Sequence, residues 1–181
     1  MIRAKSWQIV FLFLSTHTLY AQDALPLRPS ANAIASVRYK DTYVKITYCQ
    51  PRKRGREVFG KLVPNGEVWR TGANEATEIT LTKDIFINGT LLLAGTYSLF
   101  TIPAQDKWII ILNKDLGQWG AYNYNSKMDV LRFERPSMQS DNEMFEAFTI
   151  QFDQRNNVAD LLLLWDKTKI SIPLQFIEPR P

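Results

Sequence analysis

Apolar and polar residues alternate along most of the chain after Ser36, and turn-forming residues interrupt the alternation at short intervals. Near the C-terminus, for example, every second residue from Ile170 to Phe176 is apolar. Successive side chains of a β-strand point to opposite faces of the sheet, so this period of two indicates strands with one buried face. Helical periodicity is weak throughout. The pattern therefore predicts an all-β protein.

The alternating segments are short and regularly spaced. They cover residues 44–48, 79–81, 84–87, 90–93, 97–102, 107–113, 130–134, 145–152, 159–165 and 169–176. Asn88-Gly89 joins two of them and predicts a hairpin, because both residues accept the positive φ angles of a two-residue turn. Residues 107–113 are almost wholly apolar, which indicates a strand covered on both faces. We expect a single antiparallel β-sandwich rather than a barrel, because Pro173 suits an edge strand and a closed barrel has no edges.

The first residues have the pattern of a cleavable signal peptide. Arg3 and Lys5 precede an apolar run over residues 7–14, and a polar stretch then leads to Ala21. The run is shorter than the ~20 residues that cross a bilayer, and no later segment is long and uncharged enough to do so. The sequence therefore predicts a signal peptide over residues 1–21, an extended leader over 22–35 and a sandwich domain over 36–178. We expect the mature chain to be exported to the periplasm or the cell surface, without a transmembrane segment.

Removal of residues 1–21 changes both the charge and the chemistry of the chain. The full sequence has 22 Lys and Arg; loss of Arg3 and Lys5 leaves 20 against 18 Asp and Glu, so the net charge falls from +4 to +2. Such a weak charge argues against binding of nucleic acid. Cleavage also removes His17, the only histidine. The mature chain then lacks histidine metal ligands and any histidine-activated nucleophile, and we expect neither a metal nor a cofactor.

Cys49 is the single cysteine, so it cannot form an internal disulfide and the core alone must hold the domain together. It follows the alternating run 44–48, which favours a buried residue at a strand end over a reactive thiol. The neighbouring cations Arg52, Lys53 and Arg54 keep the reactive alternative open.

Residues 65–77 (NGEVWRTGANEAT) differ from the strands around them, because turn formers and hydrogen-bonding side chains are concentrated there. The main candidate site residues are therefore Trp69, Arg70, Asn74, Glu75 and Thr77. In one interpretation Trp69 is a stacking surface, and Arg70, Asn74 and Glu75 line a concave site for a sugar or a small anion. In the other, Arg70 and Glu75 form an ion pair that holds the turn, and Asn74 caps backbone groups.

Three residues outside this stretch complete the candidate ligand-binding set. Arg56 lies between glycines at the end of a basic loop whose other charges, from Arg52 onward, are expected to be solvated. Trp119 and Tyr122 lie in a predicted loop over residues 117–127. Glycine and asparagine surround these rings, so the rings either form a stacking platform near the polar cluster or pack within the loop.

Catalysis without histidine is a further alternative, because two carboxylates about 5 to 9 Å apart can hydrolyse glycosides. Glu67, Glu75 and Glu78 are the nearest candidates for such a pair. Acids are common on strand faces, however, and closeness in sequence does not fix the distance between side chains. The residue types therefore favour binding over catalysis.

Several stretches of the chain resemble one bacterial family. They are residues 48–51 (YCQP), 55–60 (GREVFG), 62–64 (LVP), 68–77 (VWRTGANEAT), 94–99 (AGTYSL) and 119–122 (WGAY). In this order, over residues 35–177, the chain resembles the domain of unknown function 2911 family, exported proteins found mainly in Bacteroidetes. The resemblance implies an all-β envelope domain with no established activity. Cys49-Gln50 departs from the family, which usually has serine and arginine there, and this weakens the idea of a serine nucleophile.

These patterns predict an exported, non-catalytic module that binds a small polar or carbohydrate-like ligand. The predicted ligand-binding residues are Arg56, Trp69, Arg70, Asn74, Glu75, Thr77, Trp119 and Tyr122. One alternative is a structural or protein-interaction domain of the cell envelope, in which the turn at 68–77 serves only the fold. The other is a histidine-free hydrolase that uses a carboxylate pair.

Overall fold

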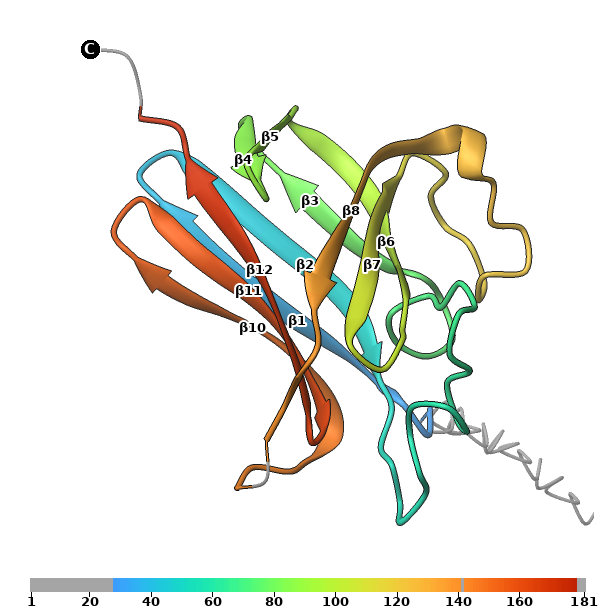
Figure 1. The fold of residues 1–181 in the computed structure, drawn as a ribbon. Helices are drawn as coiled ribbons and strands as arrows, with labels where there is room; N and C mark the ends of the chain where they lie inside the picture. The colour runs from blue at the N-terminus through green and yellow to red at the C-terminus, as the bar shows by residue number, and fades with distance from the viewer. Residues whose placement is uncertain (1–27, 141, 179–181) are drawn as a thin grey trace, which may run out of the picture.

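A computed structural model describes residues 28–140 and 142–178. Its strands form two antiparallel sheets that pack face to face, which confirms the predicted all-β sandwich (Figure 1). In spatial order, the first sheet contains β1 (Ala31–Tyr39), β2 (Thr42–Gln50), β3 (Thr77–Leu81), β6 (Gly95–Ile102), β7 (Lys107–Asn113) and β8 (Asp129–Pro136). The second contains β10 (Phe145–Arg155), β11 (Val158–Asp166), β12 (Thr168–Phe176), β4 (Ile85–Ile87) and β5 (Thr90–Leu92), and β9 (Met138–Gln139) pairs with β12. A short 3-10 helix, η1 (Ser126–Met128), precedes β8.

The predicted signal peptide, residues 1–21, and most of the predicted leader lie outside the described residues. The first sheet begins earlier than the sequence predicted, since β1 starts at Ala31 and pairs with β2 over its whole length. Residues 31–35 therefore belong to a strand rather than to a leader. Alanine and asparagine dominate this stretch and carry little β propensity, which is why the alternation was not recognised there. Within the described part of the chain, no helix has the length and apolar character needed to cross a membrane.

The alternation of the sequence becomes an alternation of burial. On β12, Ile170, Ile172, Leu174 and Phe176 are all buried, and the residues between them are more exposed. These side chains join residues of the other sheet in one core between the layers. Burial of each large aliphatic side chain contributes ~1.5–3 kcal/mol, so this shared face is the main source of stability.

Two local predictions had different outcomes. Asn88 and Gly89 have φ angles of 47° and 77°, which confirms the hairpin turn between β4 and β5. The prediction that Pro173 marks an edge strand is wrong, because β12 lies between β11 and β4. Pro173 lies just beyond the residues that pair with β4, and its carbonyl accepts the amide of Asn88 at 2.8 Å. The amide and the carbonyl of a strand residue point to the same side, so the N–H that Pro173 lacks would face β4. The pairing with β4 ends at Leu174, so no strand partner is left without a donor and the interior strand tolerates the proline.

The longest connection in the described chain joins β2 to β3 over residues 51–76. Irregular segments of this length are uncommon inside compact domains and are usually functional. Figure 1 shows this segment, in teal and green, at the end of the sandwich away from β4 and β5. Isolated β-bridges join this segment to other parts of the chain, pairing Arg52 with Ala147, Trp69 with Thr101 and Glu75 with Trp119. A further bridge, between Phe59 and Val63, lies within the segment. The predicted site residues therefore sit on a well-anchored irregular segment and the loop next to it.

Candidate functional site

Residues 69–77 form a locked turn at the end of the first sheet. Trp69 and Thr101 exchange main-chain hydrogen bonds of 2.7 and 2.9 Å, and the amide of Thr77 donates to the carbonyl of Arg70 at 3.1 Å. The Thr77 hydroxyl donates to the carbonyl of Thr71 at 2.7 Å. Thr71 is fully buried with φ at 55°, a left-handed conformation that is rare for a β-branched residue. Such strain persists only where surrounding bonds enforce it and concentrates at functional sites, so it marks this turn as a candidate.

Gly72 allows the turn to lie directly on β2. A Cβ atom at this position would be 3.0 Å from the carbonyl oxygen of Cys49 and 3.1 Å from the hydroxyl of Thr77. The same Cys49 carbonyl accepts the amide of Ala73 at 3.1 Å. Glycine is therefore required for the close approach of the two backbones.

Trp69 is a core residue rather than the open stacking surface that the sequence suggested. Its side chain is 6% exposed, and its indole Nε1 donates to the carbonyl of Gly72 at 3.0 Å. It stacks on Trp165 of β11 with ring centroids 5.8 Å apart. The surrounding rings meet it edge to face, and we refer to the set Phe59, Trp69, Trp108, Phe148 and Trp165 as the aromatic cluster. Since the cluster contains residues of both sheets, it fixes the turn rigidly onto the sandwich.

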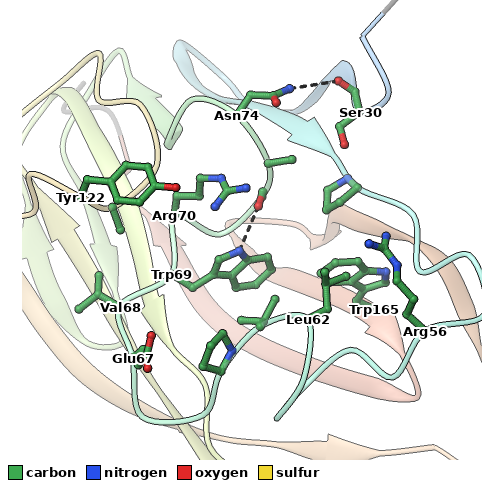
Figure 2. Close-up of a pocket in the computed structure, with 16 residues that line it drawn as sticks. Ser30, Arg56, Leu62, Glu67, Val68, Trp69, Arg70, Asn74, Tyr122 and Trp165 are labelled. Atoms are coloured by element: carbon green, nitrogen blue, oxygen red, sulfur yellow. Dashed lines mark hydrogen bonds between the residues drawn. The ribbon is translucent and has the colours of Figure 1, made fainter.

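A cavity of about 620 Å³ lies over the outer edge of the aromatic cluster, and we refer to it as the Trp69 cavity (Figure 2). Its volume falls within the range of ~300–1,000 Å³ that is typical of small-molecule sites. It is lined by Ser30, Pro51, Arg56, Leu62, Val63, Pro64, Glu67, Val68, Trp69, Arg70, Gly72, Ala73, Asn74, Ala121, Tyr122 and Trp165. The cavity is thus formed by segments that are far apart in the sequence and that the fold brings together.

Arg70 lines this cavity without a charged partner among the described residues. Its Nε atom is buried and has no hydrogen-bond partner, and no carboxylate in the described part of the chain lies within salt-bridge distance. Burial lowers the pKa of the Arg70 guanidinium, and the Tyr122 phenol and the Cys49 thiol oppose this shift. An arginine side chain stays protonated in proteins, so the cavity holds a positive charge. The alternative of an Arg70–Glu75 ion pair is wrong, because Glu75 has another partner.

The loop after β7 brings Tyr122 to the cavity. Two main-chain hydrogen bonds join it to the turn, from Ala76 to Gln118 at 2.8 Å and from Gly120 to Asn74 at 2.9 Å. Gly120 has φ at 71°, and a Cβ atom there would be 2.7 Å from the Tyr122 ring, so glycine lets the ring lie against the loop. Tyr122 is 85% exposed, and Figure 2 shows its hydroxyl pointing toward the guanidinium of Arg70.

Arg56 and Asn74 also line the Trp69 cavity. Arg56 donates from Nε to the carbonyl of Lys53 at 2.9 Å and from Nη2 to the carbonyl of Arg52 at 2.8 Å. These neutral acceptors hold the guanidinium in place without cancelling its charge. Asn74 has φ at 57°, and its side-chain nitrogen is 3.5 Å from the carbonyl of Ser30, a long contact. Figure 2 shows both side chains among the residues that line the cavity.

Glu75 turns away from the Trp69 cavity. Its two carboxylate oxygens accept hydrogen bonds from Arg28 at 2.7 and 2.9 Å, and these bonds are the main reason that the pKa of Glu75 is lowered. Cys49 is 3% exposed, and its thiol donates to Asn32 at 2.9 Å and to Glu75 at 3.4 Å. The favoured interpretation of Cys49, a buried residue at a strand end, is therefore confirmed.

A carboxylate pair gains no support from this arrangement. Among the described residues, Glu67 is the one acid that lines the Trp69 cavity, whereas Glu75 and Glu78 line a separate cavity of about 330 Å³. A glycosidase needs one carboxylic acid with a raised pKa, and the pKa of Glu75 is lowered. Glu78 accepts the amide of Gly117 at 3.0 Å. Across residues 28–140 and 142–178, no group of three or more His, Cys, Asp or Glu side chains is placed to hold a metal ion.

The structure divides the eight predicted site residues into two groups. Those that line the Trp69 cavity are Arg56, Trp69, Arg70, Asn74 and Tyr122. Glu75 faces the other cavity, Thr77 is fully buried, and Trp119 is 58% exposed outside both. Sequence reasoning missed Leu62, Ser30 and Trp165 as lining residues. Leu62 lies in one of the stretches that resemble the family, so that resemblance could have identified it. Ser30 lies in the predicted leader and Trp165 in an apolar strand, and neither context indicates a ligand site.

One family model matches most of the chain. The family model described as a protein of unknown function, DUF2911, matches residues 30–174. No curated protein and no solved structure shows significant similarity to the chain. The match covers nearly the whole sandwich and all residues that line the Trp69 cavity. The chain therefore belongs to the DUF2911 family of proteins of unknown function.

Proposed function

We propose that this domain is an exported, non-catalytic binding module whose Trp69 cavity takes a small polar or carbohydrate-like ligand. The signal-peptide pattern of residues 1–21 supports export to the periplasm or the cell surface. The size of the cavity and its position on an anchored irregular segment support ligand binding. The residues that line it do not include a nucleophile with an activating base, which favours binding over catalysis.

The observation that carries the proposal is the buried, unpartnered Nε of Arg70 in a preformed cavity. A polar group buried without a partner costs ~1–3 kcal/mol, and more when it is charged. An apolar side chain of similar length would avoid this cost if the turn had only a structural role. A ligand that hydrogen-bonds to the accessible Nη groups of the same guanidinium offsets this cost and explains why an arginine occupies this position.

The alternative of a purely structural role accounts for other residues of the 68–77 stretch. Trp69, Thr71, Gly72 and Thr77 hold the turn in place and need no ligand to account for them. Arg70 has no such role among the described contacts. We therefore assign scaffolding to one set of side chains and ligand binding to the other.

The proposal is tested by an NMR titration of the mature chain with neutral sugars, sugar acids and sugar phosphates. We expect at least one compound to shift the indole N–H resonance of Trp69, which donates to Gly72 at the floor of the cavity. Ala121→Trp, which fills the Trp69 cavity, should abolish the shift. Ala104→Trp, which fills a separate cavity of about 410 Å³, should leave it unchanged. A panel without any response, or a response that survives Ala121→Trp, would overturn the proposal.

A further inference from the structure

The Trp69 cavity offers mainly hydrogen-bond donors and positive charge. Its charged side chains are two guanidinium groups, Arg56 and Arg70, against one carboxylate, Glu67. The indole donors are already used within the protein, by Trp69 to Gly72 and by Trp165 to the carbonyl of Glu146. The polar groups left for a ligand are therefore dominated by cationic donors. A ligand rich in acceptors and negative charge complements such a lining.

The two guanidinium groups differ in how the protein holds them. Arg56 spends two of its N–H donors on the carbonyls of Lys53 and Arg52, which fixes its orientation. Arg70 keeps its Nε donor buried and unpartnered. Its two Nη groups are not among the buried atoms, and the fork that they form at the end of the planar guanidinium matches the two oxygens of a carboxylate or phosphate. A neutral hydroxyl satisfies one of the two donors, whereas an oxyanion satisfies both.

Burial strengthens this preference. Arg70 is partly buried, so a charge-assisted hydrogen bond to its guanidinium is less screened than at the surface. The exposed hydroxyl of Tyr122, which points toward Arg70 in Figure 2, adds a further donor at the mouth of the cavity. Both residues are held on loops that main-chain hydrogen bonds lock together, so the donors are preorganised.

Building on the proposed function, we infer that the ligand is a small molecule with a carboxylate or phosphate group, which the two Nη groups of Arg70 bind through two hydrogen bonds. The Arg56 guanidinium supplies a second fixed positive charge in the same cavity. The remainder of the ligand lies over the edges of Trp69 and Trp165.

The test compares matched probes in which an anionic group replaces a neutral one: glucuronate and glucose 6-phosphate against glucose, and benzoate against benzamide. Dissociation constants are measured by calorimetry. Binding that Ala121→Trp abolishes is assigned to the Trp69 cavity, because Ala121 lines that cavity. We expect at least one anionic probe to bind about tenfold or more tightly than its neutral match. Arg70→Met should reduce its affinity to that of the neutral match. Arg70→Lys, which keeps the charge but loses the fork, should remove most of the preference.

The control is Arg38→Met, which removes an exposed positive charge on β1 outside the cavity and should change the affinity less than about twofold. Preference for glucuronate or benzoate identifies a carboxylate site, and preference for glucose 6-phosphate identifies a phosphate site. Equal binding of charged and neutral probes, or a preference that survives Arg70→Met, overturns the inference and leaves the proposed function standing. Absence of binding by every probe and by the sugar panel overturns both.

Discussion

Neighbouring residues of the 69–77 turn have different tasks because their side chains point in different directions. Trp69 and Thr77 point into the protein and lock the turn, whereas Arg70 lines the open cavity. Glu75 lies on the other side and pairs with Arg28, 47 positions away in the sequence. The sequence showed that this stretch is special but grouped all its polar residues into one site. Only the three-dimensional direction of each side chain separates those that build the turn from those that face a ligand.

Thr77→Val tests the structural half of this division at the residue scale. Valine keeps the size of the side chain but removes the hydroxyl that donates to the buried carbonyl of Thr71. We expect the free energy of unfolding, measured by urea denaturation, to fall by about 1–3 kcal/mol. Thr80→Val on the same strand is the control, because that hydroxyl meets only the Thr96 hydroxyl at a partly exposed site, and should change stability by less than ~0.5 kcal/mol. Equal effects of the two substitutions would contradict the locking role of Thr77.

At the scale of elements, the positions of most strands and one hairpin were predictable, but β1 and the order of the strands within the two sheets were not. Periodicity of two is a local signal, so the apolar run over residues 107–113 and the Asn88-Gly89 turn were placed correctly. The position of Pro173 inside a sheet depends on where a distant strand ends, which no local pattern reports. The Trp69 cavity depends in the same way on contacts between the turn, the 117–122 loop and the start of β1.

Tyr124 anchors the far end of the loop that carries Tyr122, and it gives a pH-dependent test of that anchor. Its hydroxyl donates to Asp129 at 2.6 Å, and burial, followed by this hydrogen bond, raises the pKa of Tyr124 to about 12. Because an unfolded tyrosine ionises near pH ~10, the neutral phenol stabilises the folded state fully below that pH. This contribution is lost as the pH rises toward about 12, the pKa in the folded state.

We therefore expect the free energy of unfolding to fall between about pH 10 and about pH 12 more steeply in the wild type than in Tyr124→Phe. The difference between the two declines should be about 1–2 kcal/mol. Comparison with Tyr124→Phe removes the contribution of the other tyrosines, which titrate in both proteins. Parallel curves for the two proteins would show that the Tyr124–Asp129 contact does not anchor the loop.

At the scale of the whole molecule, the sandwich holds one end rigid. Side chains from both sheets meet in the aromatic cluster, and the long irregular segment after β2 is fixed on it. This scaffold leaves a cavity in which the guanidinium of Arg70 lacks a protein partner among the described contacts. Proteins tolerate such a loss of stability where a side chain is needed for function. Our central claim is that Arg70 is kept for a ligand and not for the fold.

The free energy of unfolding of Arg70→Met, measured without ligand, tests this claim most directly. Methionine retains a flexible apolar stem while removing the guanidinium, whose Nε is buried and unpartnered. We predict a stability equal to that of the wild type or higher by up to about 2 kcal/mol, since an unsatisfied buried group disappears. A loss of about 3 kcal/mol or more, as breaking a buried ion pair produces, would contradict the account and assign Arg70 to the architecture of the domain.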